Sequence, residues 1–357
     1  MKIQIINSSD PLWLKTLELI PHDFYHLPEY VDLEATRTHA KAEAILIADG
    51  EKIFFLPYLW RDCHDLLADT VEIFDVISPY GYPGFLLNQF ATTNHDFLNL
   101  AMDELTKTWR DRNVCSAFLR LHPILNQDIN KMTNDDLFTV NGETVSVNLE
   151  LEPSEIWHQT RGDHRNKINK RKREGFSAKM VPIEEYINEF NAVYEETMDR
   201  VGASKSYYFG LDYFAKMSEV LGDKLHLCMV ELHGEITCGG LFTECCGIVQ
   251  FHLSGTKSSF LKQAPTTLML DYVRFWAKER GHQVLHLGGG VGGTKDSLYQ
   301  FKAGFSKERQ TFFTLRLITD EEKYLHLVKL RAKYLNIEVE KLLNTNFFPA
   351  YRSNGLG

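Results

Sequence analysis

The segment from Leu285 to Phe305, LHLGGGVGGTKDSLYQFKAGF, holds five glycines within six residues and a lysine near its end. Gly288 to Gly293 fits the letters Gly-x-Gly-x-x-Gly, but a dinucleotide site also needs an acidic residue about 20 positions further on. The chain there reads TFFTLRL, and Gly293 is followed by Thr-Lys-Asp, which does not fit a Walker loop. We therefore predict no nucleotide fold. The glycines either let the backbone approach a cleft and place Lys302, or permit a tight reversal.

A second segment that could do chemistry is strongly basic. Residues 161–173, RGDHRNKINKRKR, carry a local charge of +6 in a chain whose net charge is -9, so the rest of the chain carries -15. Two interpretations stay open: a solvated basic helix, or an element that contacts phosphate. In the second, Arg161 and Arg165 are the better candidates, because guanidinium forks match phosphate oxygens. The pattern predicts one helix from EPSEIW onward, with Trp157, Thr160, His164 and Ile168 inward, Arg161, Arg165 and Lys172 beside them, and Lys170, Arg171 and Arg173 in water.

Composition limits the classes of function. The six cysteines form no Cys-x-x-Cys pair and predict reduced core residues. The pairs His22/His26 and His282/His286 lack an adjacent Glu and a third ligand, so no metal site is predicted. The acidic net charge argues against general DNA binding. No apolar run is long enough to span a membrane and no signal sequence is seen, so a cytoplasmic protein is expected.

The elements that must position these residues occur twice in the same order. Residues 42–60 and 225–244 each predict a β-hairpin, and each hairpin is followed by a strand, a helix and another strand. The two predicted helices cover residues 93–112 and 265–280, and residues 321–343 have the spacing of a further packing helix. His252 and Ser254 alternate on the strand before the second helix; they either orient a bound group or pair within the sheet. An internal duplication and two domains are therefore predicted.

The quoted residues resemble a known family. HRNKINKRKREGF, LMLDYVRFWAKERGHQVLHLGG and SLYQFKAGF follow in the order seen in FemABX and FemAB-like (BioF-like) acyltransferases of the GNAT superfamily. ISPYGYPGFLL is similar to a loop in the first GNAT-like domain of those proteins, and the most specific element is Tyr-x-Phe-Lys-x-x-Phe at 299–305. The resemblance implies an α/β protein of two tandem GNAT-like domains, each a mixed sheet flanked by helices. We assign residues 1–147 plus 320–357 to the first domain and 148–319 to the second.

The resemblance also implies transfer of an acyl or aminoacyl group to an amine, commonly on a cell-envelope precursor of the peptidoglycan type. Lys302 and Tyr299 match the family element; we expect Lys302 to stabilise negative charge or a donor phosphate, with a structural salt bridge as the alternative. Tyr80 and Tyr82 are candidate acceptor contacts, and the alternative for both is that they only pack within a turn. SSFLKQAP lacks the glycines of the usual CoA loop, so the donor is either acyl-CoA or aminoacyl-tRNA, and no tightly bound cofactor is expected. The competing hypothesis is a non-catalytic module that binds an anionic partner through residues 161–173.

Overall fold

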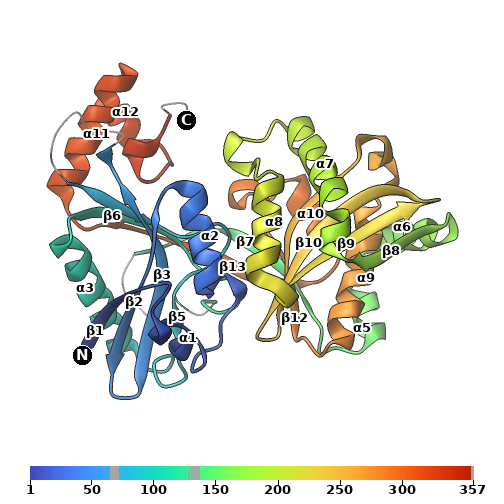
Figure 1. Cartoon of the computed structure of the whole chain (residues 1–357), viewed down its shortest axis with the longest axis horizontal. Coiled ribbons are helices and arrows are strands. Elements are labelled where there is room, and N and C mark those ends of the chain that lie inside the picture. Colours follow the sequence, from blue (N-terminus) through green and yellow to red (C-terminus); the bar gives the residue numbers. More distant parts are fainter. Residues whose placement is uncertain (65–71, 128, 130–136, 355–357) are drawn as a thin grey trace. The chain divides into compact units, whose positions relative to one another are not determined.

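The computed structural model describes residues 1–64, 72–127, 129 and 137–354, and the chain forms two compact units. Unit 1 comprises Met1–Asn141 and Phe312–Gly357, and unit 2 comprises Gly142–Thr311 (Figure 1). The domain boundaries expected from the sequence, after residues 147 and 319, lie within one strand and just past another. Residues 355–357 of the first assignment lie outside the described part of the chain.

Unit 1 is built on a mixed sheet with the strand order β1-β2-β3-β4-β6-β13, and β5 pairs with β3. All these pairs are antiparallel except β4 with β6. Its strands are β1 (Lys2–Asn7), β2 (Lys41–Asp49), β3 (Lys52–Asp62), β4 (Phe74–Ile77), β5 (Leu86–Leu87), β6 (Val114–Arg120) and β13 (Glu308–Ile318). Among its described residues, the helices of five residues or more are α1 (Pro11–Leu17), α2 (Pro28–Thr38), α3 (His95–Asp111), α11 (Glu321–Leu335) and α12 (Val339–Leu343).

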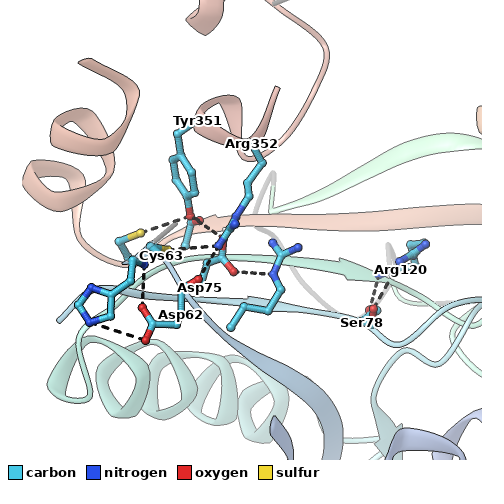
Figure 2. Close-up of polar contacts among 11 residues, drawn as sticks. Asp62, Cys63, Asp75, Ser78, Arg120, Tyr351 and Arg352 are labelled. Atoms are coloured by element: carbon cyan, nitrogen blue, oxygen red, sulfur yellow. Dashed lines mark hydrogen bonds and ion pairs between the residues drawn. The ribbon is translucent and has the colours of Figure 1, made fainter. Parts of the chain in front are cut away.

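The main core of unit 1 lies between the sheet and α3, where alternate strand residues such as Ala117, Leu119 and Leu315 are fully buried. A smaller core joins α11 and α12 to the strand ends. Here the buried carboxylate of Asp75 accepts hydrogen bonds from Tyr351 Oη (3.1 Å) and Arg352 Nε (3.0 Å), as Figure 2 shows. These bonds fix the C-terminal segment on the sheet, because a buried carboxylate must be paired.

Unit 2 is built on mixed strands with the order β7-β12-β11-β10-β9-β8. Its strands are β7 (Phe138–Asn148), β8 (Phe176–Val181), β9 (Leu225–Leu232), β10 (Glu235–Cys245), β11 (Ile248–Thr256) and β12 (Val284–Gly288). Its α-helices are α5 (Pro153–Gln159), α6 (Gly162–Arg173), α7 (Ile183–Val201), α8 (Leu211–Leu221), α9 (Thr266–Glu279) and α10 (Ser297–Lys302). Only β11 and β12 are parallel among the pairs with a described register.

Helices cover both faces of the unit 2 sheet, and two adjacent glycines of β10 show which helix lies on which face. A Cβ at Gly239 would stand 3.2 Å from the ring of Phe190 on α7, whereas a Cβ at Gly240 would stand 2.8 Å from Met269 on α9. Because successive strand residues point to opposite faces, α7 and α9 lie on opposite sides of the sheet. The two glycines allow both helices to approach it closely.

Two predicted helices are broken in the structure. The helix predicted from EPSEIW through the basic segment is instead two helices, α5 and α6, because the backbone is extended at Thr160 and Arg161. The break shifts the faces of α6, so Arg171, predicted to face water, is 5% exposed and pairs with Glu174 at 2.8 Å. Likewise, residues 321–343 form α11 and α12, because Asn336 adopts a left-handed conformation that ends the first helix.

Candidate active site

The candidate site of unit 2 lies where β11 and β12 separate. Their parallel pairing covers only Ile248 to Gln250 and Val284 to His286, although β11 continues to Thr256 and β12 to Gly288. A bulge in β11 accompanies this separation: Phe251 pairs with Phe242 and Leu253 with Leu241, which leaves His252 as the extra residue. We call the separating segments, Phe251–Thr256 and Leu287–Gly289, the fork.

Lys302 places its amine against both arms of the fork. Nζ donates a hydrogen bond to the carbonyl oxygen of Gly289 (2.7 Å) and lies 5.8 Å from the ring centroid of Phe251. The side chain is 9% exposed, and burial lowers the pKa of the amine from 10.5 to about 8, partly opposed by the charge of Asp296. Lys302 is therefore still largely a cation at neutral pH, but one that loses its proton easily.

The glycine segment folds on itself through Asp296. Its carboxylate accepts hydrogen bonds from the backbone N–H groups of Val291 (3.0 Å) and Tyr299 (2.9 Å), and the second bond caps α10. A Cβ at Gly290 would stand 2.1 Å from Thr294 O and 2.3 Å from this carboxylate. The compact turn thus requires glycine at 290, and a side-chain carboxylate already occupies the amide of Val291. This arrangement supports the prediction that the segment is not a nucleotide loop.

Tyr299, the other residue taken from the family element, belongs to a polar network beside Lys302. Its hydroxyl donates to Glu143 Oε2 (2.9 Å) and accepts a hydrogen bond from Arg309 Nε (3.1 Å). Lys295 Nζ also pairs with Glu143, at 2.6 Å. The tyrosine is buried, and its hydroxyl joins Glu143, at the start of unit 2, to Arg309, near the end of the same unit.

The N-terminal end of the basic helix α6 holds the C-terminal end of α10. Arg161 pairs with Asp163 and donates to Gln300 O (3.2 Å), while its backbone N–H donates to Gly304 O (2.8 Å). His164 Nε2 donates to Phe301 O (2.9 Å). Each of these bonds ends on a carbonyl group in or just after α10, so the start of α6 fixes the helix that carries Lys302.

His164 was predicted only as an inward packing residue, and its contact with α10 was not foreseen. It is 1% exposed, burial lowers its pKa, and its ring packs edge-on against Phe305 (4.8 Å between centroids). A Cβ at Gly304 would stand 2.5 Å from the imidazole. The one signal in the sequence was the glycine at 304, since a glycine often marks a close approach.

The remaining unit 2 candidates lie in different surroundings. Arg165 is half-buried one turn after Arg161, and none of the contacts described for the chain involves its guanidinium. His252 is half-buried at the bulge, and burial lowers its pKa to about 3, so it is neutral at physiological pH. Ser254 pairs with Gly240 on β10, two residues beyond the bulge. His252 and Ser254 therefore both lie on the β11 arm of the fork, opposite the arm that Lys302 contacts through Gly289.

Tyr80 and Tyr82 belong to unit 1, in the loop between β4 and β5. The backbone N–H of Tyr80 donates to Glu34 Oε2 (3.2 Å), and its carbonyl accepts from Tyr30 Oη (2.9 Å). The ring of Tyr82 packs edge-on against Phe312 at 5.0 Å between centroids. Turn packing thus accounts for the backbone of Tyr80 and the ring of Tyr82, and a role toward an acceptor stays a prediction.

These features define a class by fold: an α/β protein with two units, each a mixed sheet flanked by helices, one of them with a forked parallel strand pair and a buried lysine. Among solved structures, the chain is similar to FemX (13% identity, 91% of this chain and 99% of that chain, TM-score 0.68). It is also similar to L-PGS from Bacillus licheniformis (15% identity, 94% and 98%, TM-score 0.54). A third similar structure is the C-terminal domain of a putative lysylphosphatidylglycerol synthetase from Agrobacterium fabrum (11%, 85% and 90%, TM-score 0.52).

These structures confirm the FemAB-like fold that the sequence resemblance suggested. The sequence matches no family model, and a comparison with curated proteins also gives no match. Among the helices in the described part of the chain, none has the length and apolar character needed to cross a membrane.

Proposed function

We propose that this protein is an N-acyltransferase that moves an acyl or aminoacyl group from acyl-CoA or aminoacyl-tRNA to an amine. The observation that carries the proposal is the cationic amine of Lys302, held at the fork of β11 and β12. The fold shared with FemX supports it, as does the likeness to a putative lysylphosphatidylglycerol synthetase. As the sequence resemblance implies, the acceptor is an amine, commonly on a cell-envelope precursor.

The reaction needs a neutral amine to attack an activated carbonyl carbon. A negative charge then develops on the carbonyl oxygen, the bond to the thiol sulfur or ribose oxygen breaks, and that leaving atom takes up a proton as the amine loses one. An ammonium has three N–H groups. Within the described part of the chain, Lys302 donates one of them, to the carbonyl oxygen of Gly289. The other two can donate to the developing oxyanion, where their effect is large because the site is poorly solvated.

Electrostatic stabilisation by Lys302 requires the lysine to be protonated, whereas the acceptor amine must be neutral. A pKa of about 8 for Lys302 leaves a pH range near neutrality in which both conditions hold for a fraction of the molecules. Positioning of Lys302 by Asp296, Arg161 and His164 then sets its distance to the donor. No covalent enzyme intermediate is required by this scheme.

A mass-spectrometric screen tests the proposal. The full chain is incubated with acetyl-CoA, longer acyl-CoAs or charged tRNAs, each against amine acceptors such as amino-sugar nucleotides and peptidoglycan precursors. The proposal predicts a mass increase of one acyl or aminoacyl group on one acceptor class, with the free thiol or uncharged tRNA as the second product. The absence of product with every donor and acceptor would refute it.

The second candidate, a non-catalytic module for an anionic partner, rests on the C-terminal half of α6. Lys170 is 61% exposed and Lys167 47% exposed, and Arg173 is exposed beside them. If the protein binds RNA or a nucleotide sugar but transfers no label, and if Lys170→Met with Arg173→Met weakens that binding, this candidate replaces the first. Lys224→Met, an exposed lysine elsewhere in unit 2, serves as a control for charge alone.

A further inference from the structure

One face of the unit 1 sheet carries two arginines on neighbouring strands. In the β6–β13 ladder Arg120 lies directly opposite Thr314, and Phe118 directly opposite Arg316. Directly opposite residues of an antiparallel pair point to the same face, and so do alternate residues of one strand. These four side chains therefore lie together, and we call them the Arg120–Arg316 face.

The Arg120–Arg316 face points away from the α3 core, because the intervening residues Leu119 and Leu315 are buried in that core. Phe348 of the C-terminal segment covers part of it, with its ring 6.3 Å from that of Phe118. Arg120, Phe118 and Arg316 are only half-buried, so the face reaches solvent. All four of its residues belong to unit 1.

Arg120 is oriented by the loop that carries the candidate acceptor tyrosines. Its backbone N–H donates to Ser78 Oγ (2.9 Å), its guanidinium lies 3.4 Å from Ser78 O, and the guanidinium carbon lies 6.0 Å from the ring centroid of Phe118. Figure 2 shows Arg120 and Ser78 together, apart from the Asp75 cluster. Ser78, at the start of the loop that carries Tyr80 and Tyr82, thus borders the Arg120–Arg316 face.

Two polar groups of this face lack the partners that burial demands. Thr314 is 1% exposed, and its hydroxyl has no hydrogen-bond partner among the described residues; the same holds for Nε of Arg316. No ion pair with a carboxylate is described for Arg316 either, whereas Arg61 of β3 and Arg352 of the C-terminal segment both pair with Asp75. A buried donor without a hydrogen bond is costly, so this arrangement favours a ligand that brings several acceptor oxygens.

We propose that the Arg120–Arg316 face binds the phosphate of a ligand. Guanidinium forks match phosphate oxygens, the hydroxyl of Thr314 supplies a further donor, and Phe118 gives an apolar floor for the group that bears the phosphate. The phosphate belongs to a soluble nucleotide-linked molecule or to a lipid headgroup. The claim that this molecule is the acceptor rests on the transfer reaction proposed above. The claim that the face binds phosphate does not depend on that reaction.

Binding is measured directly on the full chain, without a transfer assay. Calorimetry and the shift in unfolding temperature use inorganic pyrophosphate and UDP as soluble probes. Cosedimentation uses vesicles of phosphatidylglycerol, with phosphatidylcholine vesicles as the neutral control. The variants are Arg316→Met, Thr314→Val and the control Lys107→Met, which removes one exposed charge from α3 on the opposite side of the sheet.

The expected result is that wild type binds the soluble probes or the anionic vesicles, and that Arg316→Met weakens this binding by about 10-fold or more. Thr314→Val, which keeps the shape of the side chain, weakens it by a factor of about 3 to 10 and remains informative if Arg316→Met fails to fold. Lys107→Met binds as wild type. The proposal is overturned if wild type binds no probe, or if Arg316→Met and Thr314→Val both bind the probes as tightly as wild type. Either result counts whatever the outcome of the transfer screen.

Discussion

Replacing Lys302 by methionine should stabilise the protein at neutral pH. At high pH the variant should no longer be more stable than wild type. Burial lowers the pKa of this amine from 10.5 to about 8, and each pKa unit corresponds to about 1.36 kcal/mol, so the charged lysine costs the fold about 3 kcal/mol. The lost hydrogen bond to Gly289 offsets about 1 kcal/mol of this. A net gain of about 2 kcal/mol is expected for Lys302→Met at about pH 7.

The pH dependence has a definite sign. Between about pH 8 and pH 10.5 the unfolded chain binds a proton that folded Lys302 has already lost, so the stability of wild type relative to the variant rises with pH. The difference in the free energy of unfolding between the two proteins should therefore change by about 3 kcal/mol across this window, which reverses the sign of that difference. Urea unfolding of both proteins at matched pH values measures it.

Lys307→Met provides the matched control, since Lys307 is exposed five residues further along the chain. Its effect on the free energy of unfolding should be small and independent of pH. If Lys302→Met destabilises the protein equally at neutral and alkaline pH, Lys302 is not a desolvated cation, and its assignment to the oxyanion loses its physical basis.

Three further predictions follow from the same contacts. The transfer rate of wild type should fall as pH rises through about 8, and Lys302→Arg should move this limb of the profile of kcat/KM to higher pH; an unmoved limb would assign it to another group. Asp271→Ala should cost about 3–5 kcal/mol in urea unfolding, because it removes the carboxylate that pairs with the fully buried Arg274 at 2.6 Å; a cost below about 1 kcal/mol would contradict this. Gly304→Ala should lower both stability and transfer, since its methyl group displaces the imidazole of His164, and normal values for both would show that the ring does not position α10.

Short-range signals predicted much of the fold. Asp49-Gly50 and Gly234 both turn hairpins, with positive φ at each glycine. The helix expected over residues 265–280 spans Thr266–Glu279, because Pro265 and Gly281 delimit it. Turn and cap residues act within a few positions of themselves, so one sequence is enough to interpret them.

The parts of the site that the sequence did not predict depend on contacts between distant segments. The bond from His164 to Phe301 joins residues 137 positions apart, and nothing in the helical spacing of residues 161–173 indicates it. The extended backbone at Arg161 broke the expected helix because its N–H pairs with Gly304 rather than within a helix. The burial of Arg171 followed from that break. Asn336, by contrast, was a readable signal for a helix end.

The most direct test of the central claim compares transfer by wild type, Lys302→Met and Lys307→Met in one assay, with the donor and acceptor that the screen identifies. If Lys302 stabilises the oxyanion, Lys302→Met should lower the single-turnover rate by about 100-fold or more while the protein stays folded. Lys307→Met should transfer at the wild-type rate. A folded Lys302→Met variant with near-normal single-turnover transfer would contradict the account.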